Sequence, residues 1–285
     1  MTYHELWRPL TALYDAGEAQ AIARMVLELR FGLTMADVLC GRTGDEHELQ
    51  LIQQRLLAGE PVQYVIGETE FGGRRFRVAP GVLIPRPETY ELCQWVIEER
   101  EDIEVRGARY EVREMSPRGE RILDIGTGSG CIACTLAAEL PEAEVTAWDI
   151  SEDALAIARE NAKRTHVHVS FELVDVLHSP PISRYDLIVS NPPYICENEK
   201  AQMESHVLEH EPHLALFVPD NDPLLFYRAI ADFALRSLSP GGRLFFEINP
   251  LYATDLANLL SAMSYHDIEI RNDQFDKPRM IKATR

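Results

Sequence analysis

The chain has 285 residues, of which 46% are hydrophobic and 26% charged, and its formal net charge is −18 at pH 7. This composition is typical of a globular protein and excludes a fibrous chain or extended disorder. The acidic balance repels phosphate backbones, so we expect no stable nucleic-acid binding, and no apolar run is long enough for a membrane span.

The first 60 residues predict a small all-helical domain. Apolar residues recur at helical spacing through residues 17–32, with Met25 and Leu29 on one face. Thr34 is an expected N-cap, and Gly59 followed by Pro61 ends the last helix. This stretch has neither a glycine-rich loop nor an evident metal cluster, so we interpret residues 1–60 as a recognition domain.

Two features of the sequence predict a cytoplasmic protein. The amino-terminal residues lack the basic region and apolar run of a signal peptide. The five cysteines are scattered and odd in number, which predicts reduced thiols.

Residues 61–85 predict a β-hairpin linker, because short β-prone runs there are interrupted by glycines. Its basic cluster, Arg74, Arg75 and Arg77, is a weak candidate for a site that binds RNA or an acidic partner. A helix is expected over residues 88–101. The charge run at 98–120 predicts a solvated excursion with weak strand character.

Residues 86–285 predict an α/β domain, because strands alternate with helices of 10 to 15 residues from position 121 onward. We therefore expect a mostly parallel sheet with helices on both faces, and an antiparallel edge formed by the last two strands. The expected strands are residues 121–125, 143–150, 167–175, 185–191, 243–249, 266–273 and 279–285.

The glycines at 126, 128 and 130 directly follow the first sheet strand, with Thr127 and Ser129 between them. Such glycines allow a tight turn and let a ligand approach the backbone. The dinucleotide fingerprint fails because Cys131 stands where a further glycine is needed, and no Gly-Lys-Ser/Thr of a P-loop follows. A nucleoside ligand without a pyrophosphate fits the loop better.

Acidic residues end the next two strands. Asp149, nineteen residues after Gly130, is suited to accept hydrogen bonds from both ribose hydroxyls. Asp175 with the apolar Val176 and Leu177 behind it is suited to an adenine amino group and ring. A generic αβ turn also favours Gly and Asp, but three such features in order favour a nucleoside site.

At this point the domain resembles the class I (Rossmann-like) methyltransferases that use S-adenosylmethionine. The resemblance implies that the cofactor lies over the carboxyl ends of the strands, with Asp124 near its methionine end. The cofactor-binding residues that we predict are Gly126, Thr127, Gly128, Ser129, Gly130, Asp149, Asp175, Val176 and Asn191.

The fourth strand ends in Asn191-Pro192-Pro193-Tyr194, which we predict to be the catalytic and substrate-binding motif. An amide nitrogen is a poor nucleophile because its lone pair is delocalised. If the Asn191 side-chain oxygen and the Pro192 carbonyl accept its two N–H bonds, the lone pair is oriented at the methyl donor. The prolines hold the loop, and the Tyr194 ring can stack on a planar group.

Seven segments in order resemble the release-factor glutamine N5-methyltransferases: residues 61–73, 82–89, 122–133, 149–162, 185–195, 209–216 and 238–248. This resemblance implies methylation of the glutamine in the Gly-Gly-Gln motif of peptide chain release factors. It also implies that the helical domain contacts the release factor. Tyr90 and Asn249 depart from the family pattern, which has an acidic residue and a glycine there.

Two other functions remain open from the residues alone. The Asn-Pro-Pro-Tyr motif also occurs in amino-methyltransferases acting on nucleic-acid bases, although the charge of −18 disfavours that substrate. The other alternative is a binding protein that keeps the fold but has no catalytic activity. Such a protein would be expected to lack Asn191 or the glycines at 126, 128 and 130, and all of them are present. The pairs Cys131/Cys134 and His206/His210 are interpreted as structural, so no metal is predicted, and we expect a monomer.

Overall fold

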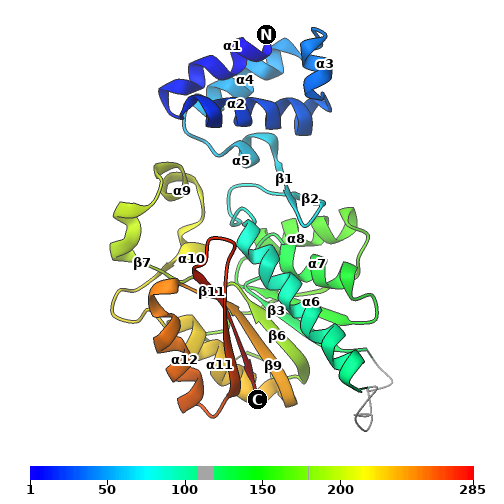
Figure 1. The fold of residues 1–285 in the computed structure, drawn as a ribbon, viewed down its shortest axis with the longest axis vertical. Coiled ribbons are helices and arrows are strands. Elements are labelled where there is room, and N and C mark those ends of the chain that lie inside the picture. Colours follow the sequence, from blue (N-terminus) through cyan, green and yellow to red (C-terminus); the bar gives the residue numbers. More distant parts are fainter. Residues whose placement is uncertain (108–118, 179) are drawn as a thin grey trace.

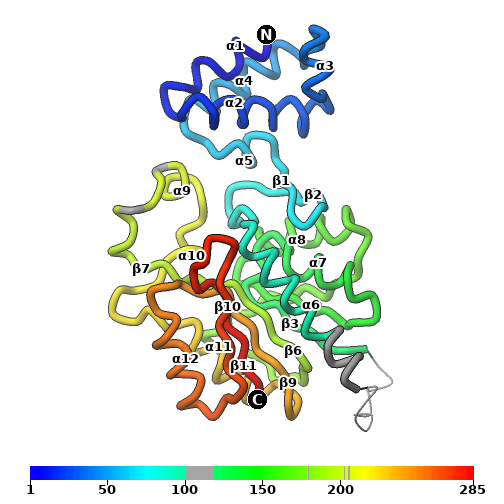
Figure 2. The backbone as a smooth tube through the Cα atoms, in the orientation of Figure 1, coloured from blue at the N-terminus to red at the C-terminus, as the bar shows by residue number. Residues whose placement is uncertain are grey.

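The computed structural model describes residues 1–107, 119–178 and 180–285. A bundle of short helices lies at one end of the molecule, and a larger α/β domain lies at the other (Figure 1). The hairpin of β1 (Glu68–Phe71) and β2 (Arg74–Arg77) connects them. Figure 2 follows the chain from the amino-terminal helices to the last strands, which form one edge of the sheet in the α/β domain.

The amino-terminal residues are helical, as predicted. Thr2, Asp15, Thr34 and Asp45 each cap a helix by accepting a backbone N–H three residues on. The helices enclose their own core of leucines, isoleucines, valines and alanines. They are α1 (Tyr3–Trp7), η1 (Arg8–Ala12), α2 (Ala16–Met25), η2 (Val26–Arg30), α3 (Met35–Leu39), α4 (Glu46–Leu57) and α5 (Val62–Ile66).

The connecting segment differs from the sequence prediction at its start. Val62–Ile66 is a helix, α5, and not part of the hairpin, because Val62, Val65 and Ile66 pack into the core of the helical bundle. The hairpin itself is present from Glu68 to Arg77. Its three arginines each pair with a glutamate, Glu139, Glu68 and Glu160 respectively, which neutralises the basic cluster.

The large domain is built on a seven-stranded sheet, in the order β10-β11-β9-β6-β3-β4-β5. Its first five strands in the chain are mutually parallel, whereas β11 pairs antiparallel with both β9 and β10. The predicted antiparallel edge is therefore confirmed. The strands are β3 (Arg121–Ile125), β4 (Glu144–Asp149), β5 (Ser170–Leu173), β6 (Tyr185–Ser190), β9 (Leu238–Glu247), β10 (His266–Asn272) and β11 (Pro278–Thr284).

Helices cover both faces of this sheet (Figure 1). One face packs against α6 (Pro87–Gly107), α7 (Cys131–Glu139) and α8 (Glu152–Arg164), through a core that includes Trp95 and Phe245. The other packs against α11 (Leu225–Ser237) and α12 (Ala253–Ala262), around Phe233 and Phe246. The central parallel strands β3 and β6 are buried on both sides, which explains their largely apolar sequences, whereas β5 at the edge is mostly exposed.

A smaller excursion follows β6 and covers one end of the sheet. It contains a short parallel pair of strands that the sequence pattern did not indicate. Its elements are β7 (Ile195–Cys196), η3 (Glu197–Gln202), α9 (Ser205–His210), α10 (His213–Leu216) and β8 (Phe217–Val218). A further short helix, η4 (Pro250–Tyr252), lies outside the excursion and directly precedes α12.

Where the structure describes the charged segment at 98–120, it shows a helix and ion-paired side chains in place of the expected excursion with strand character. Helix α6 continues to Gly107, and residues 108–118 lie outside the described residues. Glu98, Glu99 and Glu120 also contact the sheet, where they pair with Arg271 (2.7 Å), Lys282 (2.6 Å) and Arg243 (3.3 Å) respectively. The pairs of Glu98 and Glu99 arise because α6 runs beside the antiparallel edge, whereas Glu120 lies just before β3. The local sequence reveals neither arrangement.

Two strand boundaries also differ from the prediction. Strand β5 covers only Ser170–Leu173, so Asp175 lies two residues beyond its end. Strand β9 begins at Leu238 and not at the expected residue 243, so Pro240, Gly241 and Gly242 lie within the strand. Within the described residues, no helix combines the length and apolar character needed to cross a membrane.

Candidate active site

The glycine loop between β3 and α7 exposes part of its backbone. Gly126 and Gly128 have φ angles of +74° and +54°, which glycine adopts without strain. A Cβ built at either position would meet nothing within 4 Å. The Gly126 and Thr127 N–H groups donate to the Trp148 carbonyl, which fixes the loop to β4. A ligand can therefore approach this backbone closely, as the sequence predicted.

Gly130 has a different structural role. A Cβ there would lie 3.0 Å from Cβ of Ala158 on α8, in a backbone with φ of +80°. Its N–H donates to the Thr127 carbonyl at 2.8 Å. The third glycine thus allows α7 and α8 to pack closely. Thr127 and Ser129 are buried in the base of the loop, where Thr127 donates its hydroxyl to Asp124 at 2.6 Å.

Asp149 lies at the end of β4, beside the open part of the loop. Its Oδ2 accepts the Gly128 N–H at 2.8 Å, and its Oδ1 accepts the Ser151 N–H at 2.9 Å. Burial raises the pKa of this half-buried carboxyl, although the backbone donors oppose the rise. A carboxylate has about four acceptor sites, so two remain for a pair of ligand hydroxyls.

Asp175 and Val176 lie in the turn after β5. The Asp175 carboxylate accepts the Leu177 N–H at 2.8 Å and contacts the His178 ring at 2.7 Å. Val176 packs against the apolar core on the α11 face. Val176 thus offers an apolar contact, whereas both Asp175 oxygens already have local partners.

Asp124, at the end of β3, is fully buried. Its Oδ2 accepts bonds from the Thr127 hydroxyl and the Ala133 N–H, whereas Oδ1 has no hydrogen-bond partner in the described part of the chain. Burial raises its pKa to about 7 despite these two donors. An orphaned buried acceptor beside an open glycine loop fits a ligand that carries a cationic donor.

Asn191 directly follows β6 and starts the Asn-Pro-Pro-Tyr motif. Its Nδ2 donates to the Thr89 hydroxyl at 3.2 Å, and Thr89 donates to Oε2 of Glu247 at 2.6 Å. The Tyr194 hydroxyl donates to Oε1 of the same glutamate at 3.0 Å. The described residues make no hydrogen bond to Oδ1 of Asn191 or to the Pro192 carbonyl, so both predicted acceptors are available.

Thr89, Glu247 and Asn249 also contact the motif, although their sequence context predicted no role for them. Each lies within or beside a segment on which the family resemblance rests. The Asn249 amide donates to the Tyr194 carbonyl at 3.1 Å and to Glu199 at 3.0 Å, so this departure from the family pattern supports the motif. Tyr90, the other departure, packs its ring against Phe71 of the hairpin.

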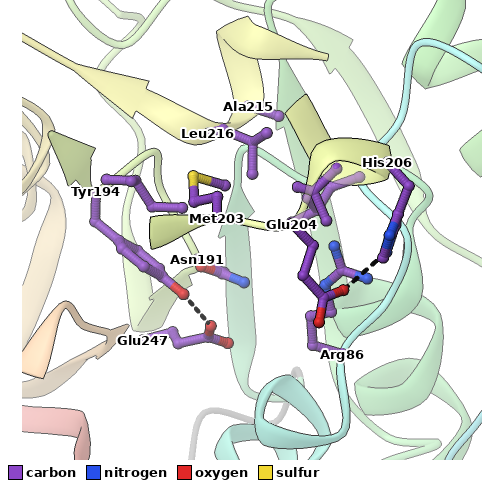
Figure 3. A pocket seen from close by; sticks show the side chains of 12 residues that line it. Arg86, Asn191, Tyr194, Met203, Glu204, His206, Ala215, Leu216 and Glu247 are labelled. Carbon is purple, nitrogen blue, oxygen red and sulfur yellow. Dashed lines mark hydrogen bonds and ion pairs between the residues drawn. The ribbon is translucent and has the colours of Figure 1, made fainter. Parts of the chain in front are cut away.

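A cavity of about 410 Å³ opens beside the motif (Figure 3). Asn191, Tyr194 and Glu247 lie on one side of it, and Arg86, Glu204 and His206 lie on the other. Arg86 pairs with Glu211, whose side chain is fully buried and also accepts the Ile84 N–H. This pairing holds the segment before α6 against the excursion, so the cavity wall comes from distant parts of the chain.

Of the thiols and imidazoles interpreted as structural, the two cysteines lie outside the cavity, whereas His206 is part of its wall. Cys131 and Cys134 are buried and unpaired, and burial raises the pKa of each to about 12. His206 contacts Glu204 at 3.1 Å. Among the described residues, no group of three or more His, Cys, Asp or Glu side chains is arranged to hold a metal ion.

Comparisons with known proteins agree with this arrangement. Residues 106–213 match the family model "Methyltransferase small domain". The hMettl16 catalytic domain, solved in complex with an RNA hairpin, shares the fold, with a TM-score of 0.53 and 15% identity over 73% of this chain and 74% of that chain.

Two curated relatives match almost the whole chain. The release factor glutamine methyltransferase of Bacteroides thetaiotaomicron is 44% identical over 97% of this chain and 96% of its own length. That of Flavobacterium psychrophilum is 40% identical over 96% of this chain and 94% of its own length. On this likeness, which extends through the helical bundle as well as the catalytic domain, the chain belongs to the release factor glutamine methyltransferase family.

Proposed function

We propose that this protein transfers a methyl group from S-adenosylmethionine to the side-chain amide nitrogen N5 of the glutamine in the Gly-Gly-Gln motif of peptide chain release factors. The observation that carries the proposal is the Asn191 side chain in the cavity wall, whose Oδ1 has no hydrogen-bond partner among the described residues, as is also true of the carbonyl of the adjacent Pro192. The names of the relatives support the choice of substrate.

We assign cofactor binding to the loop and to the acidic residues around it. The exposed backbone at Gly126 and Gly128 admits the ligand, the free acceptor sites of Asp149 suit the ribose hydroxyls, and Asp124 Oδ1 suits the ammonium group. Val176 offers an apolar contact for the adenine ring. When bound, S-adenosylmethionine would supply a sulfonium methyl group: the new N–C bond would form as the S–C bond breaks, S-adenosylhomocysteine would leave with the electron pair, and one amide proton would be lost to solvent.

The protein acts on the acceptor amide by orientation. The two acceptors each bind one N–H of the glutamine, which holds the amide plane and directs the nitrogen lone pair out of that plane. Such positioning can supply several kcal/mol of the barrier without a general base. Burial raises the pKa of Tyr194 and keeps its phenol protonated, so Tyr194 holds Glu247 and offers its ring to the planar group.

We also propose that the helical domain contacts the release factor and that the protein acts as a monomer. The likeness to the two relatives extends through the helical domain, which supports a role of this domain in the same function. The nucleic-acid alternative gains no support from the hairpin arginines, because each of them pairs with a glutamate.

The test is mass spectrometry of a purified release factor incubated with this protein and S-adenosylmethionine. We expect one added methyl on the Gly-Gly-Gln glutamine, and none with Asn191→Ala, which should still bind the cofactor. RNA and DNA are incubated in parallel. Methyl transfer into nucleic acid and not into the release factor would refute the proposed substrate, and cofactor binding without any transfer would indicate a binding protein without catalytic activity.

A further inference from the structure

Two buried residues from distant elements meet at the Asn191 side chain. Thr89 lies in the first turn of α6, Glu247 is the last residue of β9, and each is 2% exposed. The bonds join Asn191 Nδ2 to Thr89 Oγ1 at 3.2 Å and Thr89 Oγ1 to Glu247 Oε2 at 2.6 Å. The sequence prediction placed neither residue in the site.

The chemistry of the three groups determines the direction of these bonds. An ionised carboxylate only accepts, so the single Thr89 hydroxyl proton is donated to Glu247. The Thr89 oxygen can then only accept from Asn191, which must present its NH₂ group. The Asn191 oxygen is left on the other branch of the amide, where it has no partner among the described residues. A reversed amide would place two acceptors against each other.

The same glutamate also holds the far end of the motif. Its Oε1 accepts the Tyr194 hydroxyl at 3.0 Å, and its backbone carbonyl accepts the Tyr227 hydroxyl at 3.1 Å. Burial raises the pKa of Glu247, whereas the bonds from Thr89 and Tyr194 and the charge of Arg279 favour the carboxylate. Glu247 is therefore supplied with donors on both oxygens.

We propose that Thr89 and Glu247 are positioning residues that set the polarity of the catalytic amide, holding Asn191 with its oxygen toward the acceptor cavity. This inference rests on the proposed function, in which that oxygen accepts an N–H of the substrate amide. Without the relay the Asn191 amide is free to turn by 180°, and its NH₂ group would then face the donors of the substrate.

Near-isosteric variants separate this role from packing. Thr89→Val removes the hydroxyl, whereas Thr89→Ser keeps it. In Glu247→Gln the new amide group can donate to the Thr89 oxygen, so that the Thr89 hydroxyl can donate its proton to Asn191 instead. Thr135→Val is the matched control, because Thr135 is fully buried in α7 and its hydroxyl has no hydrogen-bond partner in the described part of the chain. The readouts are kcat and KM for the release factor, and the cofactor Kd by calorimetry.

We expect Thr89→Val and Glu247→Gln to lower kcat by about 10- to 100-fold, with the cofactor Kd within about threefold of wild type, because a misdirected amide impairs the transition state. Thr89→Ser and Thr135→Val should stay within about threefold of wild type. If Thr89→Val does not fold, kcat of Glu247→Gln and of Thr89→Ser still tests the positioning role.

Three results would overturn the inference. These are an unchanged kcat in Thr89→Val or Glu247→Gln, a rise in cofactor Kd that accounts for the whole loss, and a loss in Thr89→Ser as large as in Thr89→Val. Wild-type transfer to the release factor is measured first and tests the proposed function by itself. If the wild type methylates another amide or amine, the variants are compared on that acceptor, so the two failures stay distinguishable.

Discussion

The buried carboxyl of Asp124 makes a quantitative prediction about stability. It is fully buried, its Oδ1 has no hydrogen-bond partner among the described residues, and burial raises its pKa from 3.8 to about 7. Each pH unit of that rise corresponds to about 1.4 kcal/mol, so the ionised group costs the cofactor-free protein about 4 kcal/mol relative to the unfolded chain.

The sign follows from proton binding. Below pH 3.8 both states carry the proton and the full stability is present, whereas between pH 3.8 and about 7 the folded chain keeps the proton that the unfolded chain has lost. Stability therefore falls as the pH rises through this window. From about pH 5 to about pH 8 the expected loss due to Asp124 is about 3 kcal/mol.

Asp124→Asn isolates this contribution. The Asn oxygen can accept from Thr127 and Ala133 as Oδ2 does now, and its NH₂ group replaces the orphaned oxygen. Urea unfolding of both proteins is followed at about pH 5 and about pH 8 by tryptophan fluorescence. A Trp7→Phe background restricts the signal to Trp95 and Trp148, which are buried in the catalytic domain.

The variant should gain about 3 kcal/mol relative to wild type between the two pH values, because Asn does not titrate. A stability difference that is the same at both values would refute a raised pKa for Asp124. Adding S-adenosylmethionine at about pH 8 should stabilise the wild type more than the variant, since only the carboxylate attracts the ammonium group.

Three further predictions test the glycine loop and the thiols. Asp149→Ala should raise the cofactor Kd by about 10- to 100-fold by removing charge-assisted hydrogen bonds, with kcat retained at saturating cofactor; an unchanged Kd in calorimetry would exclude Asp149 from the ribose site. Gly130→Ala should lower the free energy of unfolding by about 2 kcal/mol, because its Cβ meets Ala158 at 3.0 Å in a backbone with φ of +80°; a urea midpoint equal to wild type would contradict this. In the folded protein a thiol reagent should modify only Cys40 rapidly, because the other four cysteines are buried, and all five should react in urea; a second fast thiol would contradict the burial.

The sequence was informative wherever the physical cause is local. Glycine and proline interrupt secondary structure at their own positions, so the loop at 126–130 was predicted where the structure has it, and the end of β6 at Ser190 was predicted to within one residue. The alternation of strands and helices predicted the sheet, because consecutive parallel strands need a helical crossover. Parallel strands align their carboxyl ends, which is why Asp149 and Asn191 were expected at one edge.

The tertiary structure decided which distant residues meet there. Thr89 contacts Asn191, and Glu247 contacts Thr89, only because α6 starts and β9 ends beside the end of β6. Neither the helix start nor the strand end shows this in its own sequence. The contact of Gly130 with Ala158 and the ion pairs of Glu98 and Glu99 have the same origin. Periodicity and turn chemistry act over a few residues, whereas these contacts depend on the order of strands in the sheet and on which face each helix covers.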